Sequence, residues 1–241
     1  MTRLTGGIRS ELHFHLLPAV DDGPVTLDEA IELARMAVAD GTGTIVCTPH
    51  VAQVDVATIP DRVRELQAQL DRAGVPLRLV GGAEVSPGDV LTDAELSVIA
   101  QGPPGRRWVL LEAPLNGAPV EELHATADEL EARGYGILLG HPERSKRFLA
   151  PDGGLERRLR RGNLLQVNAS SLTGLHGDRA RDAGIELIDR GLVTVLASDA
   201  HRPTRPPRLT EALAVAGDPS LTDSAPAALL ERGIAPLRQA A

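Results

Sequence analysis

The feature that most constrains the fold is a regular alternation of short apolar runs with helical patterns along nearly the whole chain. The apolar runs are typical of buried strands, and the segments between them have the period of amphipathic helices. The seven runs cover residues 9–15, 44–50, 77–84, 108–112, 136–141, 163–168 and 192–199. Strict alternation of strand and helix predicts an α/β protein with a parallel sheet, either open or closed into a barrel.

The segments between the runs carry their own helix boundaries. Thr26-Leu-Asp-Glu29 has the pattern of a capping box, and Gly41 follows the last periodic residue of the same segment. A glycine also closes the helical pattern before three later runs, at Gly74, Gly134 and Gly191. Neither a low-complexity segment nor a Ser/Gly-rich linker divides the chain, so we expect a single domain over residues 1–241.

Charge and aromatic content exclude several partners. The 33 Asp and Glu outnumber the 25 Lys and Arg, for a formal charge of −8, and the aromatic residues are Phe14, Trp108, Tyr135 and Phe148. Nucleic-acid binding needs basic surfaces and stacking side chains, so we expect no nucleic-acid partner. We also expect no membrane span and a cytoplasmic location, because no apolar run approaches about 18 residues and Met1–Ser10 lacks a signal-peptide core.

The single cysteine, Cys47, limits the chemistry further. It can form neither an internal disulfide nor a thiolate metal site. A cysteine phosphatase needs Arg six positions after its Cys, where this chain has Gln53, so we interpret Cys47 as a packing residue of a buried strand. The chain has no G-x-S-x-G elbow, and its one lysine, Lys146, lacks P-loop glycines. Any metal must therefore bind to His, Asp or Glu.

Metal-ligating side chains gather at the carboxyl ends of the predicted strands. These positions hold His13, His15, His50, Glu84, Glu112, His141, Asp199 and His201. All are suitable ligands for a divalent ion, and the two histidines of a His-x-His share one side of a strand. In a barrel the carboxyl ends of the strands converge on one face, whereas an open sheet spreads them along a line, so we favour a barrel.

Other histidines and acids have simpler interpretations. His124 and His176 fall in predicted helix or loop, and we expect both to be solvated and not to bind metal. Asp21 and Asp22 before Gly23 fit a turn, although their position shortly after the His-x-His makes a ligand role plausible for the pair.

With these residues in view, the chain resembles the polymerase and histidinol phosphatase (PHP) superfamily, and within it the bacterial capsular-polysaccharide-type tyrosine phosphatases. The resemblance covers nearly the whole chain and rests on motifs in a fixed order. They are His13-Phe-His15, Val20-Asp-Asp-Gly23, Thr48-Pro-His50, Gly82-Ala-Glu84, Leu111-Glu112, His141-Pro-Glu-Arg144, Ser171-Leu-Thr-Gly174, Ser198-Asp-Ala-His201 and Arg205-Pro-Pro207.

The resemblance implies a distorted seven-stranded (β/α)7 TIM-like barrel with three divalent metal ions, which could be manganese, iron or zinc. It implies that Glu84 is a bridging ligand and that Arg144 and Arg205 bind the substrate phosphate. The implied ligand sets are His13, His15, Glu84 and Asp199 for one ion, His50, Glu84 and His141 for a second, and Asp22, Glu112 and His201 for the third.

The implied activity is metal-dependent hydrolysis of phosphomonoesters, as in the protein-tyrosine phosphatases linked to exopolysaccharide biosynthesis. Clustered divalent ions lower the pKa of a bridging water, and the resulting hydroxide attacks phosphorus. The implied partner is a phosphotyrosine protein such as a bacterial tyrosine kinase, or else a small phosphomonoester. The segment Val51-Ala-Gln-Val-Asp55 departs from the usual loop after His50, and an aromatic clamp on a phenol ring could come only from the chain's four aromatic residues.

Three alternatives remain open on the sequence. The first is a phosphatase of the same superfamily for a small metabolite such as histidinol phosphate. The second is a non-catalytic regulatory module, against which the intact motifs argue. The third is an amidohydrolase, which shares the His-x-His and the late Asp but leaves His201 and Arg205 without a role.

Overall fold

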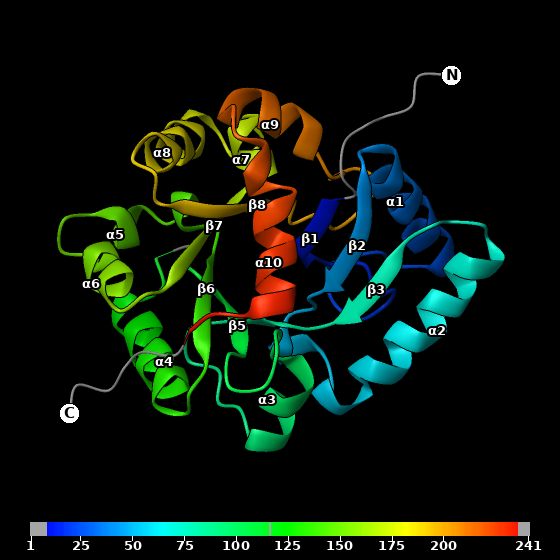
Figure 1. Ribbon diagram of the computed structural model, residues 1–241, viewed down its shortest axis with the longest axis horizontal. Helices are drawn as coiled ribbons and strands as arrows, with labels where there is room; N and C mark the ends of the chain where they lie inside the picture. Colours follow the sequence, from blue (N-terminus) through cyan, green and yellow to red (C-terminus); the bar gives the residue numbers. More distant parts are fainter. Residues whose placement is uncertain (1–8, 116, 236–241) are drawn as a thin grey trace.

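Over residues 9–115 and 117–235, which the computed structural model describes, eight strands form two parallel sheets. The strands are β1 (Arg9–Phe14), β2 (Thr42–Cys47), β3 (Arg78–Gly81), β4 (Glu84–Val85), β5 (Trp108–Glu112), β6 (Gly136–Gly140), β7 (Leu164–Asn168) and β8 (Val193–Ala197). One sheet has the order β1-β2-β3 and the other β4-β5-β6-β7-β8, with every neighbouring pair parallel (Figure 1). The parallel α/β fold predicted from the alternating pattern is therefore confirmed.

The two sheets meet at the carboxyl ends of their strands. On one side, an isolated parallel bridge joins His50, which follows β2, to Glu84 of β4. On the other side, Phe14 of β1 is bridged to Ala200, which follows β8, and the His15 N–H donates to the Ala200 carbonyl at 2.9 Å. Residues that follow strands of both sheets are thereby held next to one another.

The third predicted strand, residues 77–84, is divided in the structure. β3 pairs with β2 and β4 pairs with β5, so Gly82 and Ala83 carry the chain from one sheet to the other. A Cβ on Gly82 would lie 2.7 Å from Val46 Cγ1, which is closer than carbon atoms pack. The expectation of one continuous strand was wrong because the backbone turns here, and only glycine allows this close approach to β2.

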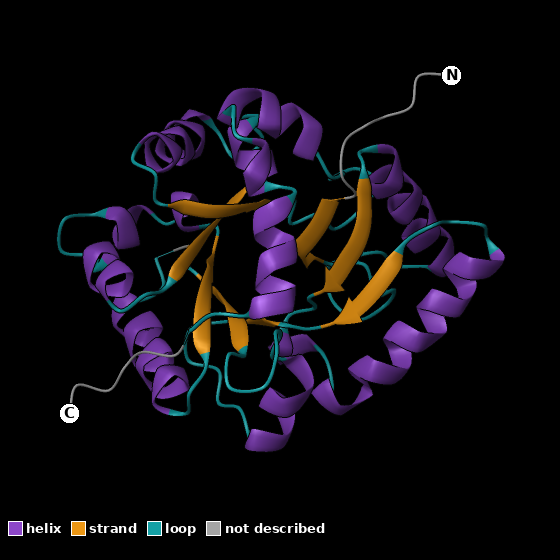
Figure 2. Ribbon diagram, viewed as in Figure 1, coloured by secondary structure: helices purple, strands orange, loops and turns teal. Residues whose placement is uncertain are grey.

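Ten α-helices within the described residues connect the strands and surround them (Figure 2). They are α1 (Leu27–Ala39), α2 (Ile59–Arg72), α3 (Asp93–Ile99), α4 (Val120–Ala132), α5 (Lys146–Leu149), α6 (Leu155–Arg160), α7 (Ala169–Leu172), α8 (Asp178–Asp189), α9 (Leu209–Ala216) and α10 (Ser224–Arg232). Short 3₁₀ turns cover Val51–Gln53, Val56–Thr58, Pro142–Arg144 and Pro219–Leu221.

The predicted capping box at α1 is half right. The Thr26 hydroxyl accepts from the Glu29 N–H at 3.2 Å, but the Glu29 carboxylate accepts from Val25 N at 2.6 Å instead of Thr26 N. A reciprocal capping box occurs at α3, between Thr92 and Glu95. The cap still fixes the first residue of α1, since a hydroxyl acceptor satisfies one of the free N–H groups there.

Two apolar clusters hold the strands in place. The larger fills the space between strands and helices and includes the buried side chains of Phe14, Cys47 and Phe148, which confirms Cys47 as a packing residue. The smaller is Leu12, Val46, Trp108, Leu110, Leu138, Val195, Leu229 and Ile234. It joins strands of both sheets to α10, which lies across the centre of the view in Figure 1. Burying each large apolar side chain of these clusters stabilises the folded state by roughly 1.5–3 kcal/mol.

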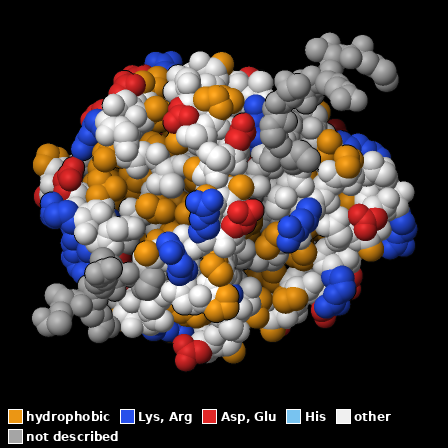
Figure 3. Space-filling view, in the orientation of Figure 1, with side chains coloured by type: hydrophobic (Ala, Val, Ile, Leu, Met, Phe, Trp, Pro, Cys, Tyr) orange, Lys and Arg blue, Asp and Glu red, His pale blue; other side chains and the backbone are white. Residues whose placement is uncertain are grey.

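The surface around α10 carries positive and negative side chains interspersed with apolar ones (Figure 3). No helix within the described residues combines the length and the apolar character needed to cross a membrane.

Candidate metal centre

The nine predicted metal ligands lie together at the carboxyl ends of the strands. They fall into four overlapping groups, within each of which one ligand atom per residue lies within 4.8 Å of the others. The groups are His15, Asp22, His50 and His201; His13, His15 and Glu84; His13, His141 and Asp199; and Glu84, Glu112 and His141. Residues distant in the sequence therefore form one continuous cluster, because the strands of the two joined sheets and the loops that follow them converge here.

Glu84 lies at the centre of this cluster. Its Oε2 is 3.3 Å from His13 Nε2, 3.3 Å from His15 Nε2 and 3.1 Å from His50 Nδ1. Its Oε1 is 3.2 Å from His141 Nε2. The carboxylate is 1% exposed and its two oxygens face different histidines, which is the arrangement that a bridging ligand requires.

Asp199 connects the histidines to the two predicted phosphate-binding arginines. Its Oδ1 is 3.3 Å from His13 Nε2, and its Oδ2 accepts from Arg144 at 3.3 Å and from Arg205. Arg205 Nε is buried and has no hydrogen-bond partner among the residues that the structure describes. Both guanidinium groups line the same cavity as the metal-ligating side chains.

Two of the cluster residues have unusual backbone conformations. His141 has φ +36° and Asp199 has φ +52°, the left-handed region that L-residues rarely adopt. His141 directly follows β6 and Asp199 lies two residues after β8, where the chain turns toward the cavity. Such strain costs on the order of 1–3 kcal/mol and is typical of functional sites.

Glu143 fixes the segment between His141 and Arg144. Its buried carboxylate accepts from Ser171 Oγ at 2.6 Å and from the Asn168 N–H at 3.2 Å. Burial raises the pKa of Glu143. The His-Pro-Glu-Arg motif is thus tied to the end of β7 and to α7, and this connection orients both the histidine and the arginine of the motif.

Three residues outside the predicted ligand set contact the candidate ligands; sequence reasoning considered Asp21 only as a turn or ligand residue beside Asp22, and missed Gln166 and Asn168. Asp21 Oδ2 is 2.7 Å from His15 Nδ1 and also accepts from the His50 N–H at 3.2 Å. Gln166 Oε1 is 3.0 Å from His13 Nδ1, and Asn168 Nδ2 donates to Asp199 Oδ2 at 2.7 Å. A carboxylate or amide on the second imidazole nitrogen fixes the tautomer and the ring orientation of a ligand. Gln166 and Asn168 carried a usable signal, since two polar residues end a buried strand.

The geometry pairs two ligands differently from the resemblance. Asp22 Oδ1 lies 3.3 Å from His201 Nε2 and 3.5 Å from His50 Nε2. Glu112 instead lies 3.7 Å from His141 Nε2, within the group that contains Glu84. The expected set of Asp22, Glu112 and His201 about one ion is therefore divided between two groups in this structure.

The cluster needs positive charge at its centre. Burial alone would lower the pKa of His15, but the Asp21 and Glu84 carboxylates outweigh it and raise that pKa to about 10. Although burial opposes the charged form, His13 and the other histidines hold the pKa of Glu84 well below its ordinary value. Burial and the neighbouring Glu84 charge raise the pKa of Glu112. Closely spaced buried carboxylates of this kind stay ionised only beside cations.

The donor set fits divalent metal ions. It consists of imidazole nitrogens and carboxylate oxygens with no thiolate, since burial raises the pKa of the Cys47 thiol and that side chain belongs to the apolar core. His141 Nδ1 is buried without a hydrogen-bond partner among the described residues. Mixed nitrogen and oxygen donors suit manganese, iron and zinc.

The two remaining histidines belong to no such group in the described part of the chain, and neither is simply solvated. His124 is half-buried on α4, with Nε2 3.2 Å from the Gly153 carbonyl oxygen. His176 is half-buried, with Nε2 3.0 Å from Ser170 Oγ. The expectation of solvated positions was wrong because the loop after α5 contacts His124, and His176, in the loop after α7, folds back onto Ser170 of that helix.

The cluster lines an open cavity of about 180 Å³. Its walls are formed by Asp22, His50, Glu84, Glu112, Leu115, His141, Arg144, Asp199, His201 and Arg205. None of the four aromatic residues is among them: Phe14, Trp108 and Phe148 are buried in the core, and Tyr135 packs against it. An aromatic clamp on a phenol ring is therefore absent from the described cavity wall.

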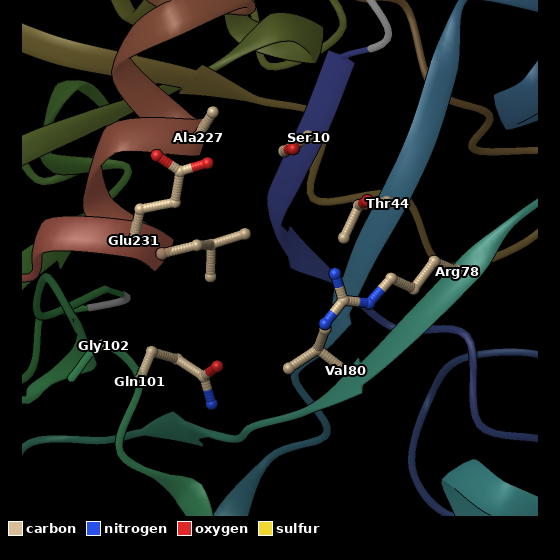
Figure 4. Close-up of a pocket in the computed structure, with 9 residues that line it drawn as sticks. Ser10, Thr44, Arg78, Val80, Gln101, Gly102, Ala227 and Glu231 are labelled. Atoms are coloured by element: carbon tan, nitrogen blue, oxygen red, sulfur yellow. The ribbon is translucent and has the colours of Figure 1, made fainter.

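A larger cavity, of about 310 Å³, lies at the amino ends of β1, β2 and β3 (Figure 4). There Arg78 of β3 and Glu231 of α10 extend from opposite sides, and Ser10, Thr44 and Gln101 supply polar groups between them. No histidine lines this cavity. This cavity is larger than the one at the metal cluster, but the concentration of ligand chemistry assigns the candidate active site to the smaller of the two.

The parallel α/β fold brings His, Asp and Glu together at the carboxyl ends of its strands, with arginines beside them. This arrangement places the protein in the class of α/β proteins with a candidate metal-dependent active site. The chain belongs to the capsular polysaccharide synthesis family CpsB/CapC, whose family model matches residues 10–220.

Individual relatives agree with this assignment. CapC from Staphylococcus aureus is 31% identical over 207 residues, which cover 84% of this chain and 81% of CapC. The tyrosine-protein phosphatase YwqE from Bacillus subtilis (strain 168) is 30% identical over 199 residues, which cover 79% of this chain and 76% of YwqE.

The fold is also found in a solved structure. Crystal structures of YwqE from Bacillus subtilis and CpsB from Streptococcus pneumoniae are described as those of unique metal-dependent tyrosine phosphatases. One of them matches this chain with a TM-score of 0.80 and 26% identity, over 96% of this chain and 100% of the other.

Proposed function

We propose that this protein is a metal-dependent tyrosine-protein phosphatase that hydrolyses phosphomonoesters in the cavity lined by Arg144 and Arg205. The observation that carries the proposal is the convergence of nine His, Asp and Glu side chains and two arginines on one site. The names of YwqE and of the matched crystal structure support tyrosine phosphatase activity. A bacterial tyrosine kinase as the substrate and a cytoplasmic location stay predictions.

The fold proposal can be made more specific. We propose one domain in which both sheets form a single distorted barrel of seven strand positions. β3 and β4 together take one position, because each supplies one half of the chain segment that crosses between the sheets. The bridges at His50–Glu84 and Phe14–Ala200 support closure at the carboxyl ends.

Three divalent ions are proposed for the cluster, with Glu84 contacting more than one of them. His13, His15 and Asp199 would hold one ion with Glu84, and His50 and His141 a second. Asp22 and His201 would serve the third, and Glu112 lies nearer to the Glu84 and His141 group. When bound, such ions polarise phosphoryl oxygens and lower the pKa of a coordinated water toward neutrality.

The two arginines supply the positive charge and hydrogen-bond donors with which the chain would bind the phosphate. Arg144 and Arg205 enter the cavity from different segments, and both are only partly exposed, at 22% and 25%. A planar guanidinium donates two parallel hydrogen bonds to a phosphate and stays charged at any working pH. A tyrosine leaving group has a pKa near 10, so it departs with less proton donation than an alkoxide needs.

Arg144→Ala and Arg205→Ala are each expected to lower kcat/KM by about 10²-fold or more, or about 2.7 kcal/mol of transition-state stabilisation. Metal content per chain should stay unchanged, because neither residue supplies a ligand atom to the cluster. Lysine at either position should restore only part of the activity, since an ammonium cannot form paired hydrogen bonds. Steady-state kinetics together with elemental analysis tests this prediction, and a loss of metal alongside activity would contradict it.

Asp21→Asn tests the orientation of His15. The amide keeps the shape of the side chain but loses the charge beside His15 Nδ1, so metal affinity should fall about 10- to 100-fold. Competition with a graded series of chelators measures that affinity. Because Asp21 also accepts from the Gly23 and His50 N–H groups, an unfolding curve must accompany the measurement. Unchanged affinity in a folded variant would argue against the orienting role.

A phosphatase for a small phosphomonoester is the second candidate. The observation that favours it is the absence of an aromatic side chain from the described cavity wall. A panel of phosphotyrosine peptides and small metabolite phosphates separates the two, and a higher kcat/KM for a metabolite would replace the first proposal.

A further inference from the structure

A second hollow adjoins the candidate active site. It is a groove of about 530 Å³, here called the basic groove. The residues that line it are Pro114, Gly117, Ala118, Arg144, Ser145, Lys146, Arg147, Ala150 and Arg179. Arg144 lines both the groove and the metal cavity, and Leu115 of that cavity directly follows Pro114 of the groove. The two hollows therefore lie side by side, and Arg144 belongs to both.

The charge of the groove is opposite to that of the chain. Four of its lining residues are cationic and none is acidic, whereas the whole chain has a formal charge of −8. Arg179 uses its guanidinium on backbone carbonyls, donating to Arg144 O at 2.8 Å and to Glu143 O at 3.4 Å. Within the described residues, Lys146 has no ion pair and Arg147 contacts only the exposed Asp152, at 2.6 Å. Arg144 is paired with Asp199 at 3.3 Å, so Lys146 and Arg179 are the two groove cations without a carboxylate partner among the described residues.

The framework of the groove is fixed. Ser145 Oγ donates to the Pro114 carbonyl at 2.5 Å, which joins its two walls. The same hydroxyl caps the short helix α5, and Phe148 anchors that helix in the core with no exposed surface. Lys146 and Arg147 therefore project from a held backbone. The small residues Gly117, Ala118 and Ala150 complete the lining of the groove.

We propose that the basic groove binds an acidic stretch of the polypeptide substrate, next to the phosphorylated tyrosine whose phosphate lies at Arg144. The groove has the size of a ligand pocket. Its small lining residues leave room for an extended backbone, and its cationic side chains match the carboxylates of an acidic segment. The cavity has no aromatic clamp to hold a tyrosine ring. Binding in the groove would supply affinity for a protein substrate in its place. This inference rests on the proposed phosphatase function.

The test compares two matched double variants with wild type. K146Q/R147Q removes two groove charges, and R62Q/R64Q removes two from α2, where Arg64 contacts Asp61 at 2.8 Å much as Arg147 contacts Asp152. The substrates are a phosphotyrosine peptide flanked by Asp and Glu, the same peptide with Asn and Gln, and 4-nitrophenyl phosphate. None of the four substituted residues belongs to the proposed catalytic machinery.

In K146Q/R147Q alone, KM for the acidic peptide is expected to rise about 3- to 10-fold. A change of this size corresponds to the loss of two exposed ion pairs between groove and peptide. The kcat of this variant, and its kcat/KM for 4-nitrophenyl phosphate, should stay within about twofold of wild type. The preference of wild type for the acidic peptide should shrink as salt is raised. Equal kcat/KM for acidic and neutral peptides in wild type, or the same loss in R62Q/R64Q, would overturn the proposal.

A binding measurement separates this inference from the proposed function. Fluorescence anisotropy of a labelled acidic peptide that carries a non-hydrolysable phosphotyrosine analogue reports on the groove without turnover. Weaker binding to K146Q/R147Q than to R62Q/R64Q supports the groove, and equal binding contradicts it. If wild type binds the peptide but hydrolyses neither 4-nitrophenyl phosphate nor any peptide, the proposed phosphatase function is wrong, while peptide binding in the groove is still supported.

Discussion

Treatment with a chelator is expected to abolish phosphatase activity, and added manganese should restore at least part of it. The cavity holds the carboxylates of Asp22, Glu84, Glu112 and Asp199, with Asp21 directly behind His15. Without compensating cations, so many negative charges in one partly buried site repel one another. Removing the ions therefore removes both the reactive chemistry and the charge balance of the site.

Cys47→Ser is the matched control for thiol chemistry. The thiol is fully buried in the core, and burial raises its pKa, so it cannot act as a nucleophile. The variant should keep turnover within a few-fold of wild type, while losing some stability from the core. Rates are measured on folded protein before chelation, after chelation and after metal is returned. Full activity in the chelated enzyme, or a folded Cys47→Ser variant without activity, would contradict the metal-dependent mechanism.

The clustering of the candidate ligands was predictable because the carboxyl ends of parallel strands meet. His13, His50 and His141 are far apart in the sequence, yet each ends or follows a strand, and strand order alone then brings them together. What the pattern did not contain was the break at Gly82. The break is caused by the close approach to Val46 on a neighbouring strand. That contact cannot be predicted from the local sequence of the apolar run.

The orienting residues were harder to predict for a related reason. Asp21 contacts His15 Nδ1 at 2.7 Å, and its neighbourhood in the sequence fits an ordinary turn equally well. The covering of His124 by the Gly153 segment likewise depends on a contact 29 residues away in the chain. Residue type and spacing therefore predict which groups can bind a metal, whereas contacts between distant segments decide which groups hold them in place.

Glu84→Gln is expected to lower the number of metal ions bound per chain and to reduce kcat/KM by more than either arginine variant. Glutamine keeps the shape of the side chain but removes the one negative charge that lies within 3.3 Å of His13, His15, His50 and His141. Cations a few ångströms apart would then repel each other without an anion between them. An amide also offers a single oxygen, so it cannot present an acceptor to both halves of the cluster.

His124→Gln is the control, since it makes a comparable polar substitution at a histidine outside every described ligand group. Glutamine can still donate to the Gly153 carbonyl that His124 contacts, so the fold should tolerate the change. Elemental analysis of folded wild type and both variants, each reloaded with manganese under the same conditions, gives the ions bound per chain. If Glu84→Gln keeps the full complement, Glu84 does not bridge, because its charge is then dispensable to the ions around it. If His124→Gln loses an ion, the ligands are not confined to the strand ends, since His124 lies on α4 behind the Gly153 loop.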